Sequence, residues 1–241
     1  MKLIVIGSSS AGNSYALQAD TGEILLLEAG VPFKEVKRAI GYKTSKIEAC
    51  LITHRHQDHA KYIKDYVKAG VTVYSNANVS ENFPNCVRTL GCEATHCFGE
   101  FSATSFWVEH DDDAPNYGYL VYHKEMGTLY FATDCYNQKQ VFQGCRTYLM
   151  ECNYEDGLLE KAVNEGKTIA SQADRIRLSH MSLAHGVKFM QDCEAEKSAK
   201  QIILIHGSSR HLNPDAVVSK FQQVLGVPTF YAKSGMVINL M

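Results

Sequence analysis

The sequence is 241 residues long, carries a formal net charge of −2 at pH 7 and is 45% hydrophobic. This length and composition predict one globular domain over residues 1–241, with a substantial core. The near-neutral charge excludes a general attraction to nucleic acid, so any polyanionic substrate must be bound locally. The sequence has no apolar run of membrane-spanning length, no secretory leader, and no CxxC pair among its eight cysteines. These features predict a cytoplasmic protein with no membrane partner.

Short apolar segments alternate with helical segments along the first half of the chain. Strands are expected over residues 2–7, 14–19, 24–28, 49–53 and 71–75. Helices are expected over residues 32–40 and 58–69, and Gly41 and Gly70 directly follow these two segments.

The second half alternates in the same way. Strands are expected over residues 101–109, 118–123, 128–133, 147–151, 201–206 and 229–239. Helices are expected over residues 157–173 and 182–199, and a third runs to Leu225 after Asn213 and Pro214, which provide an N-cap and a first-turn proline. This order predicts an α/β fold with two packed sheets and helices outside them.

Residues 54–59, HRHQDH, place three imidazoles and a carboxylate within six positions, directly after an apolar strand. His54 and His56 are two residues apart, so in extended backbone both rings point to the same side. Asp58 and His59 follow where the helix is expected to begin. Imidazole and carboxylate are ligands for zinc, iron and manganese. The segment therefore predicts the start of two neighbouring metal sites rather than a solvated polar loop.

Three more candidate ligands stand at the ends of apolar strands: His110, Asp134 and His206. Strand ends can converge at one edge of a sheet, which suits a centre with two metals. Taken alone, His110 fits a surface residue before the acidic run at 111–113. Asp134 alone fits a turn cap, and His206 alone fits a core histidine. Together with residues 54–59, the three side chains are interpreted as the remaining ligands.

The ordered set HxHxDH, His, Asp, His resembles the metallo-β-lactamase superfamily, and the resemblance covers nearly the whole chain. The segments 7–13 (GSSSAGN) and 27–30 (LEAG) fit as well, although Glu28 stands where many relatives have Asp. The resemblance implies a four-layer αβ/βα sandwich with metals at the open edge between two sheets.

The resemblance also implies two divalent ions, with zinc expected and Mn²⁺ or Fe²⁺ compatible with the same ligands. His54, His56 and His110 would hold the first ion. Asp58, His59 and His206 would hold the second, and Asp134 would bridge both. A metal-bound hydroxide, oriented by Asp58, would then attack an ester bond near neutral pH.

Further segments resemble the phosphodiesterase branch of the superfamily, which includes RNase Z and the WalJ/YycJ-type proteins. In residues 178–182 (LSHMS), His180 would assist the leaving alkoxide without binding metal. The alternative for His180 is a helix-start residue with no chemistry. Ser208, Ser209 and Arg210, in the segment HGSSR, would bind phosphate, and Asn153, in the segment ECN, is a further candidate for substrate binding.

The predicted function is that of a binuclear metal-dependent phosphodiesterase or nuclease. The gap between His110 and Asp134 is too short for the long tRNA-binding arm of many RNase Z enzymes. The gap between Asp134 and His206 is too short for a β-CASP domain. A compact enzyme acting on nucleic-acid ends or on a small nucleotide is therefore expected, and a homodimer is left open.

Three alternatives to a nuclease remain. One is a phosphodiesterase that hydrolyses cyclic nucleotides, similar to the phage-encoded anti-Pycsar enzymes. Another is a metal-stabilised binding or sensor module, which is disfavoured because all seven ligand positions and His180 are present. The last is hydrolysis of thioesters or lactones, which leaves His180 and the Ser-Ser-Arg segment without a role.

Overall fold

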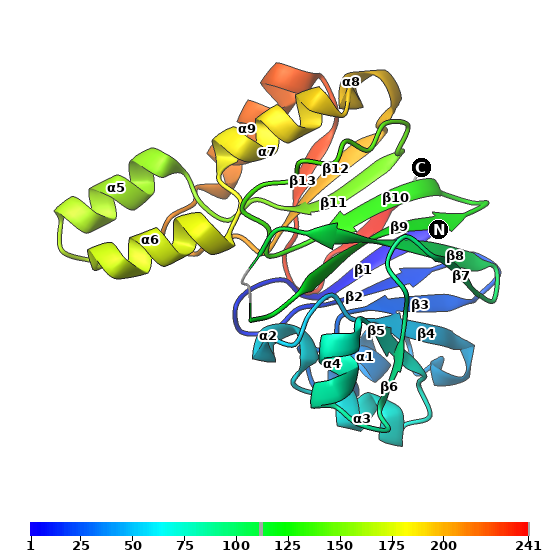
Figure 1. The fold of residues 1–241 in the computed structure, drawn as a ribbon. Coiled ribbons are helices and arrows are strands. Elements are labelled where there is room, and N and C mark those ends of the chain that lie inside the picture. The colour runs from blue at the N-terminus through cyan, green and yellow to red at the C-terminus, as the bar shows by residue number, and fades with distance from the viewer. Residues whose placement is uncertain (111–112, 241) are drawn as a thin grey trace.

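Two seven-stranded sheets pack face to face, and helices cover their outer faces (Figure 1). The structure is a computed structural model that describes residues 1–110 and 113–240. The first sheet has the strand order β14 (Val237–Asn239), β1 (Lys2–Gly7), β2 (Ser14–Gln18), β3 (Ile24–Leu27), β4 (Ile47–Leu51), β5 (Val73–Ser75) and β6 (Val87–Thr89). The second has the order β13 (Thr229–Tyr231), β12 (Gln201–Ile205), β11 (Thr147–Glu151), β10 (Gly127–Ala132), β9 (Asn116–His123), β8 (Phe101–Val108) and β7 (Thr95–Phe98).

The helices fall into two sets, one for each half of the chain. Those of the first half are α1 (Phe33–Ala39), α2 (Gln57–Ala60), α3 (Ile63–Lys68) and α4 (Ala77–Asn82), with a short 3₁₀ turn η1 (Thr44–Lys46). Those of the second half are α5 (Asp156–Asn164), α6 (Ala170–Ser179), α7 (Leu183–Asp192), α8 (Ala195–Ser198) and α9 (Pro214–Leu225). Among the described helices, none combines the length and the hydrophobicity needed to span a bilayer.

Apolar residues on both faces of the central strands create three core layers. In β10, Leu129 and Phe131 pack between the two sheets, whereas Tyr130 and Ala132 pack against the outer helices. This period-two alternation explains why the central strands are continuously apolar in sequence. On the outer face of the first sheet, Ile4, Leu26 and Ile52 pack with residues of α1 and α3. The predicted four-layer αβ/βα sandwich is therefore confirmed.

The predicted helix over 58–69 is wrong as one element, because it is divided into α2 and α3. The backbone N–H of Tyr62 donates to the carbonyl of Ala29 (2.9 Å) instead of continuing the helix. The carbonyls of Asp58 and His59 accept hydrogen bonds from Asn13 and Ala29 (both 2.8 Å). These contacts between distant segments break the helix and hold its first turn against the loops after β1 and β3.

Three other predicted elements are divided as well. The helix over 157–173 ends at Asn164, because Gly166 adopts a left-handed backbone (φ 69°). The helix over 182–199 is interrupted before α8 by Glu194 (φ 50°). The strand over 229–239 becomes β13 and β14, which lie in different sheets. The sequence analysis also did not predict α4, β6 and β7.

Gly30 brings three loops together beneath the candidate metal ligands. Its backbone N–H donates to the carbonyl of Asn13 (2.9 Å), and the backbone N–H of Asn13 donates to the carbonyl of Asp58 (2.8 Å). A Cβ atom at position 30 would overlap the carbonyl oxygen of Asp58 and lie 2.6 Å from the nitrogen of Asn13. Only glycine allows this close approach of backbones.

We therefore expect Gly30→Ala to lower the free energy of unfolding by about 3 kcal/mol or more, because backbone atoms must move to admit the new methyl group. The matched control is Gly157→Ala in α5, where a Cβ atom would meet nothing within 4 Å. The control should raise the free energy of unfolding by up to about 1 kcal/mol. Urea denaturation measures both, and equal stabilities of the two variants would contradict this account of Gly30.

Candidate metal centre

The seven predicted ligands converge at one edge of the sandwich. His54 and His56 lie in the loop after β4, and Asp58 and His59 lie in α2. His110, Asp134 and His206 lie just beyond the ends of β8, β10 and β12, as the sequence analysis expected. Asp111 and Asp112, from the acidic run that suggested a surface role for His110, lie outside the described residues. His110 itself belongs to the convergent set.

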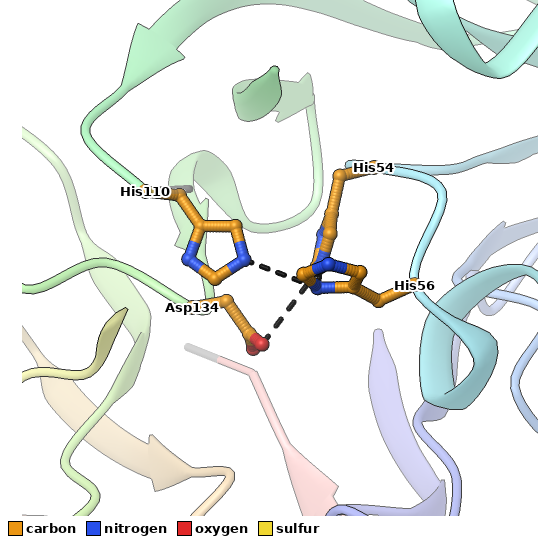
Figure 2. A group of neighbouring side chains, drawn as sticks. All are labelled: His54, His56, His110 and Asp134. Carbon is orange, nitrogen blue, oxygen red and sulfur yellow. Dashed lines mark hydrogen bonds and ion pairs between the residues drawn. The ribbon is translucent and has the colours of Figure 1, made fainter. Parts of the chain in front are cut away.

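The first group of donors consists of His54, His56, His110 and Asp134, which point toward one another in Figure 2. His56 Nδ1 lies 3.0 Å from His54 Nε2 and 3.2 Å from His110 Nε2. The Oδ2 oxygen of Asp134 lies 3.8 Å from His54 Nε2.

The second group consists of Asp58, His59, His206 and Asp134. The Oδ2 oxygen of Asp58 lies 3.2 Å from His59 Nε2 and 3.1 Å from His206 Nε2. The Oδ1 oxygen of Asp134 lies 3.2 Å from His59 Nε2. Asp134 thus turns one carboxylate oxygen toward each group.

The spacing of these donor atoms fits a divalent metal. Four ligands about 2.0–2.1 Å from a zinc ion in a tetrahedron lie about 3.3–3.4 Å from one another. The six separations given above are 3.0–3.8 Å, and all donor atoms of a group lie within 4.8 Å of one another. Such a set of facing imidazole nitrogens and carboxylate oxygens is the ligand chemistry of zinc, manganese and iron.

Neighbouring groups fix the orientation of three of the imidazoles. His110 Nδ1 donates to the carbonyl of Ser179 (3.3 Å), and His206 Nδ1 donates to Oε1 of Glu151 (2.9 Å). His59 Nδ1 lies 3.5 Å from Oε1 of Glu28. In each ring Nδ1 faces one of these oxygen atoms and Nε2 is left to bind a cation, as is usual for metal-binding histidines. His206 Nδ1 also lies 3.3 Å from Oδ1 of Asp134.

Three residues of the site that follow the ends of strands have a backbone in the left-handed region of φ. Glu28 has φ 69°, Asp134 has φ 51° and His206 has φ 53°. A non-glycine residue in this region costs about 1–3 kcal/mol, and such costs concentrate at functional sites. The turn of the backbone redirects each side chain at the point where its strand ends.

Glu151, at the end of β11, connects His180 to the metal-ligand candidates. Its Oε1 accepts from His180 Nδ1 (2.7 Å) as well as from His206 Nδ1. Its Oε2 accepts from the backbone N–H groups of Cys135 (3.0 Å) and Met181 (3.3 Å). The Asn153 amide is a fifth donor (3.2 Å to Oε1), so this buried carboxylate is held in one position. His180 is in turn held through Nδ1, so Nε2 is the ring nitrogen available to a substrate.

Electrostatics differ between the two groups. Burial lowers the pKa of His54 well below its usual value and lowers the pKa of His110. Burial also acts to lower the pKa of His206, but Asp134, Asp58 and Glu151 outweigh it and raise that pKa to about 10. In the first group, His54 and His110 are therefore neutral imidazoles, which is the form that binds metals. In the second group, nearby carboxylates favour the protonated form of His206 when no metal is bound.

The predicted substrate-binding residues lie beside the ligands, in the loop after β12 and the segment after β11. Ser208, Ser209, Arg210 and Asn153 all line a pocket of about 430 Å³. Asn153 uses its amide to donate to Glu151 (3.2 Å) and to the carbonyl of His206 (2.7 Å). The Ser208 hydroxyl accepts from the backbone N–H of Arg210 (3.3 Å). The Asn153 and Ser208 side chains thus hold neighbouring parts of the site through hydrogen bonds. The Ser209 and Arg210 side chains are exposed.

The sequence analysis missed two residues at the centre. Glu151 stands at the end of an apolar strand, and the rule that identified Asp134 and His206 would have identified it too. Asn13, in the opening GSSSAGN segment, places its amide 3.3 Å from Oδ2 of Asp58 and 3.2 Å from His59 Nε2. Both residues were noted only as parts of motifs.

Known proteins resemble this chain in sequence and in structure. No protein-family profile matches the sequence. Among curated proteins, the exodeoxyribonuclease WalJ of Streptococcus pneumoniae is 24% identical over 227 residues, covering 78% of this chain and 84% of that protein.

Solved structures resemble the whole chain. YhfI from Bacillus subtilis, described as a metallo-β-lactamase-fold protein, matches with a TM-score of 0.76 at 18% identity, covering 99% of both chains. Zn²⁺-bound PqqB from Methylobacterium extorquens matches with a TM-score of 0.74 at 14% identity, covering 100% of both chains. The short form of human tRNase Z matches with a TM-score of 0.66 at 16% identity, covering 100% of both chains.

We expect Asp134→Ala to lower the metal content of the purified protein more than His110→Ala does, because Asp134 faces both donor groups and His110 faces one. Elemental analysis of the purified variants measures this difference. The control is His96→Ala in β7, which should keep the wild-type metal content. Equal metal content in the wild type and Asp134→Ala would show that the two groups do not share this residue.

Proposed function

We propose that this chain, which has the metallo-β-lactamase fold, is a hydrolase that cleaves phosphodiester bonds of DNA with two divalent cations, zinc being expected. The observation that carries the proposal is the pair His180 and Glu151 beside the two donor groups that share Asp134. The donor groups can hold cations that activate the nucleophile and bind the reacting phosphate. His180, held by Glu151, can protonate the leaving oxygen.

Cations in the two donor groups would supply a nucleophile near neutral pH, by lowering the pKa of water, and would neutralise the phosphoryl oxygens. The first would be held by His54, His56 and His110, the second by Asp58, His59 and His206, and Asp134 would serve both. The spacing of the donor atoms supports these assignments.

Asp58 has a second role toward the attacking water. Its contacts with His59, His206 and Asn13 all use Oδ2. Oδ1 therefore remains available to accept a hydrogen bond and orient a water molecule for attack.

His180 would donate the proton that the leaving alkoxide needs. Burial acts to lower the pKa of His180, but the Glu151 carboxylate outweighs burial and raises it, which favours the imidazolium. The imidazole lines both pockets of the site, so its free Nε2 can reach a substrate. As the bond from phosphorus to oxygen breaks, the Nε2 proton passes to the leaving oxygen, and Glu151 stabilises the ring's position throughout.

DNA is proposed as the substrate because the sequence relative WalJ is an exodeoxyribonuclease. The exposed Arg210 in the loop after β12 would contribute a guanidinium to the phosphate, and Ser209 a hydroxyl. Ser208 and Asn153 would support this loop rather than contact the substrate.

A cyclic-nucleotide phosphodiesterase is the second candidate. The pocket over the donor groups has a volume of about 320 Å³. This value lies at the lower end of the range of about 300–1,000 Å³ that is typical of small-molecule sites. A mononucleotide would therefore find a pocket of suitable size.

We expect His180→Ala to lower kcat for a thymidine dinucleotide by about 10²-fold or more, with metal content retained, because an alkoxide leaves poorly without a proton. For bis-p-nitrophenyl phosphate the loss should be much smaller, since p-nitrophenolate leaves without protonation. Steady-state kinetics with both substrates measures the difference.

The control for this experiment is His185→Ala in the first turn of α7, a histidine that does not line the pocket over the donor groups. Equal losses of kcat for the two substrates in His180→Ala would contradict leaving-group protonation and point to a role in binding the phosphoryl group.

Labelled single-stranded DNA and a panel of cyclic mononucleotides distinguish the two candidates. At defined zinc content, we expect DNA to be hydrolysed with the larger kcat/KM, since the binding surface extends beyond the pocket of 320 Å³. Preference for a cyclic nucleotide would establish the second candidate. Turnover of a lactone with no turnover of bis-p-nitrophenyl phosphate would exclude both.

A further inference from the structure

The pocket over the metal-ligand candidates continues into a second pocket. The first has a volume of about 320 Å³ and the second, beside the loop after β12, about 430 Å³. The two share Ser10, His180 and His206 as lining residues. A substrate that occupies both pockets therefore passes His180, which is proposed to protonate the leaving group. Parts of such a substrate lie on both sides of the scissile bond.

One face of α6 forms a wall of both pockets. Arg175 and Ser179 line the first pocket, and Gln172 and Ile176 line the second. These positions follow the i, i+3, i+4, i+7 pattern, so the four side chains lie on one side of the helix. The helix ends at Ser179, whose carbonyl accepts the hydrogen bond from His110, and His180 follows as the C-cap. The same helix thus borders the groove and contacts the catalytic centre.

Each pocket contains one arginine that has no carboxylate partner within residues 1–110 and 113–240. Among the residues that the structure describes, neither Arg175 in the first pocket nor Arg210 in the second forms an ion pair. By contrast, Arg177, two residues along α6, pairs with Asp174 (3.1 Å). An arginine without a carboxylate keeps its guanidinium donors for a phosphate.

Hydrogen bonds connect the two walls of the second pocket, which are the α5–α6 segment and the loop after β12. In Figure 1, α5 and α6 form a hairpin that projects from the sandwich. Thr168, between the two helices, lies with its hydroxyl 3.0 Å from His211 Nε2, and Glu155 accepts from the backbone N–H of Asn213 (2.8 Å). Tyr154, Leu159 and Ala173 give the hairpin a small core. The groove between the hairpin and the loop after β12 is therefore preformed, which lowers the entropy cost of binding.

We propose that the α5–α6 hairpin is a binding arm for single-stranded DNA, in which Arg175 contacts the phosphate that flanks the scissile phosphate on the side of the first pocket. The proposal rests on the proposed function and extends it, because it identifies the substrate as a strand that continues on both sides of the cleaved bond. Arg210 holds the strand on the side of the second pocket. A cyclic mononucleotide has no flanking phosphate for Arg175.

The salt dependence of DNA binding tests this assignment. Arg175→Gln is compared with Arg177→Gln, an equal change on the same helix at a residue that lines neither pocket. Fluorescence anisotropy gives the Kd of a labelled ten-nucleotide phosphorothioate strand, which keeps its charges and is cleaved slowly. Loss of one phosphate contact should lower the slope of log K against log salt concentration by about 0.7 for a single strand.

The expected result is an affinity loss of about tenfold at low salt and the reduced slope for Arg175→Gln, with both values unchanged for Arg177→Gln. Hydrolysis of bis-p-nitrophenyl phosphate, which has no flanking phosphate, should change by less than about twofold in Arg175→Gln. Arg175 is exposed, so the substitution should leave the fold intact, and thermal unfolding of both variants checks this.

Two results would overturn the proposal. One is an unchanged slope in Arg175→Gln, or the same change in both variants. The other is an equal loss for DNA and for bis-p-nitrophenyl phosphate, which would place Arg175 at the reacting phosphate. If the wild type binds DNA with the expected slopes but hydrolyses neither substrate, the proposed function fails and the binding arm stands. If the wild type cleaves DNA but the slopes do not differ, only the binding arm fails.

Discussion

Asp134 turns its two carboxylate oxygens toward two different groups of histidines, and the geometry of the site depends on this division. The carboxylate is buried, and burial by itself would raise its pKa; the surrounding His206, His59 and His54 instead hold that pKa well below its usual value. A buried charge is tolerated only when opposite charges or a metal compensate it. The left-handed backbone at Asp134 (φ 51°) is the local cost of placing the carboxylate between the groups.

The remainder of the site is arranged around this residue by contacts between segments that are distant in the chain. Glu151 holds His180 and His206 at the same time, and the end of α6 supplies both His180 and the carbonyl that orients His110. Gly30 lets the loops of Asn13 and Asp58 approach closely enough to carry the second donor group. A change in one of these supports would therefore alter several donor atoms together, because each support serves more than one ligand.

The metallo-β-lactamase fold accommodates many reactions, so the substrate must be argued from the groove rather than from the sheets. Here the groove is bordered by a projecting hairpin that contributes Arg175, which forms no ion pair with any residue that the structure describes. The opposite wall of the groove is the loop that follows His206. The net charge of −2 gives the protein no general affinity for DNA. Binding of the proposed DNA substrate would then come from a few well-placed cationic groups, which is consistent with one arginine in each pocket.

The sequence by itself determined the seven candidate ligands and the layered fold. The motif at residues 54–59 and the apolar strands that end at His110, Asp134 and His206 are local patterns, and strand ends meet at a sheet edge whatever the details of packing. Only the tertiary structure decided that Glu151 links His180 to His206, that Arg175 faces the groove while Arg177 does not, and that the helix after Asp58 breaks at Tyr62. These features depend on hydrogen bonds and exposure set by segments far apart in the chain, which local spacing and periodicity do not encode.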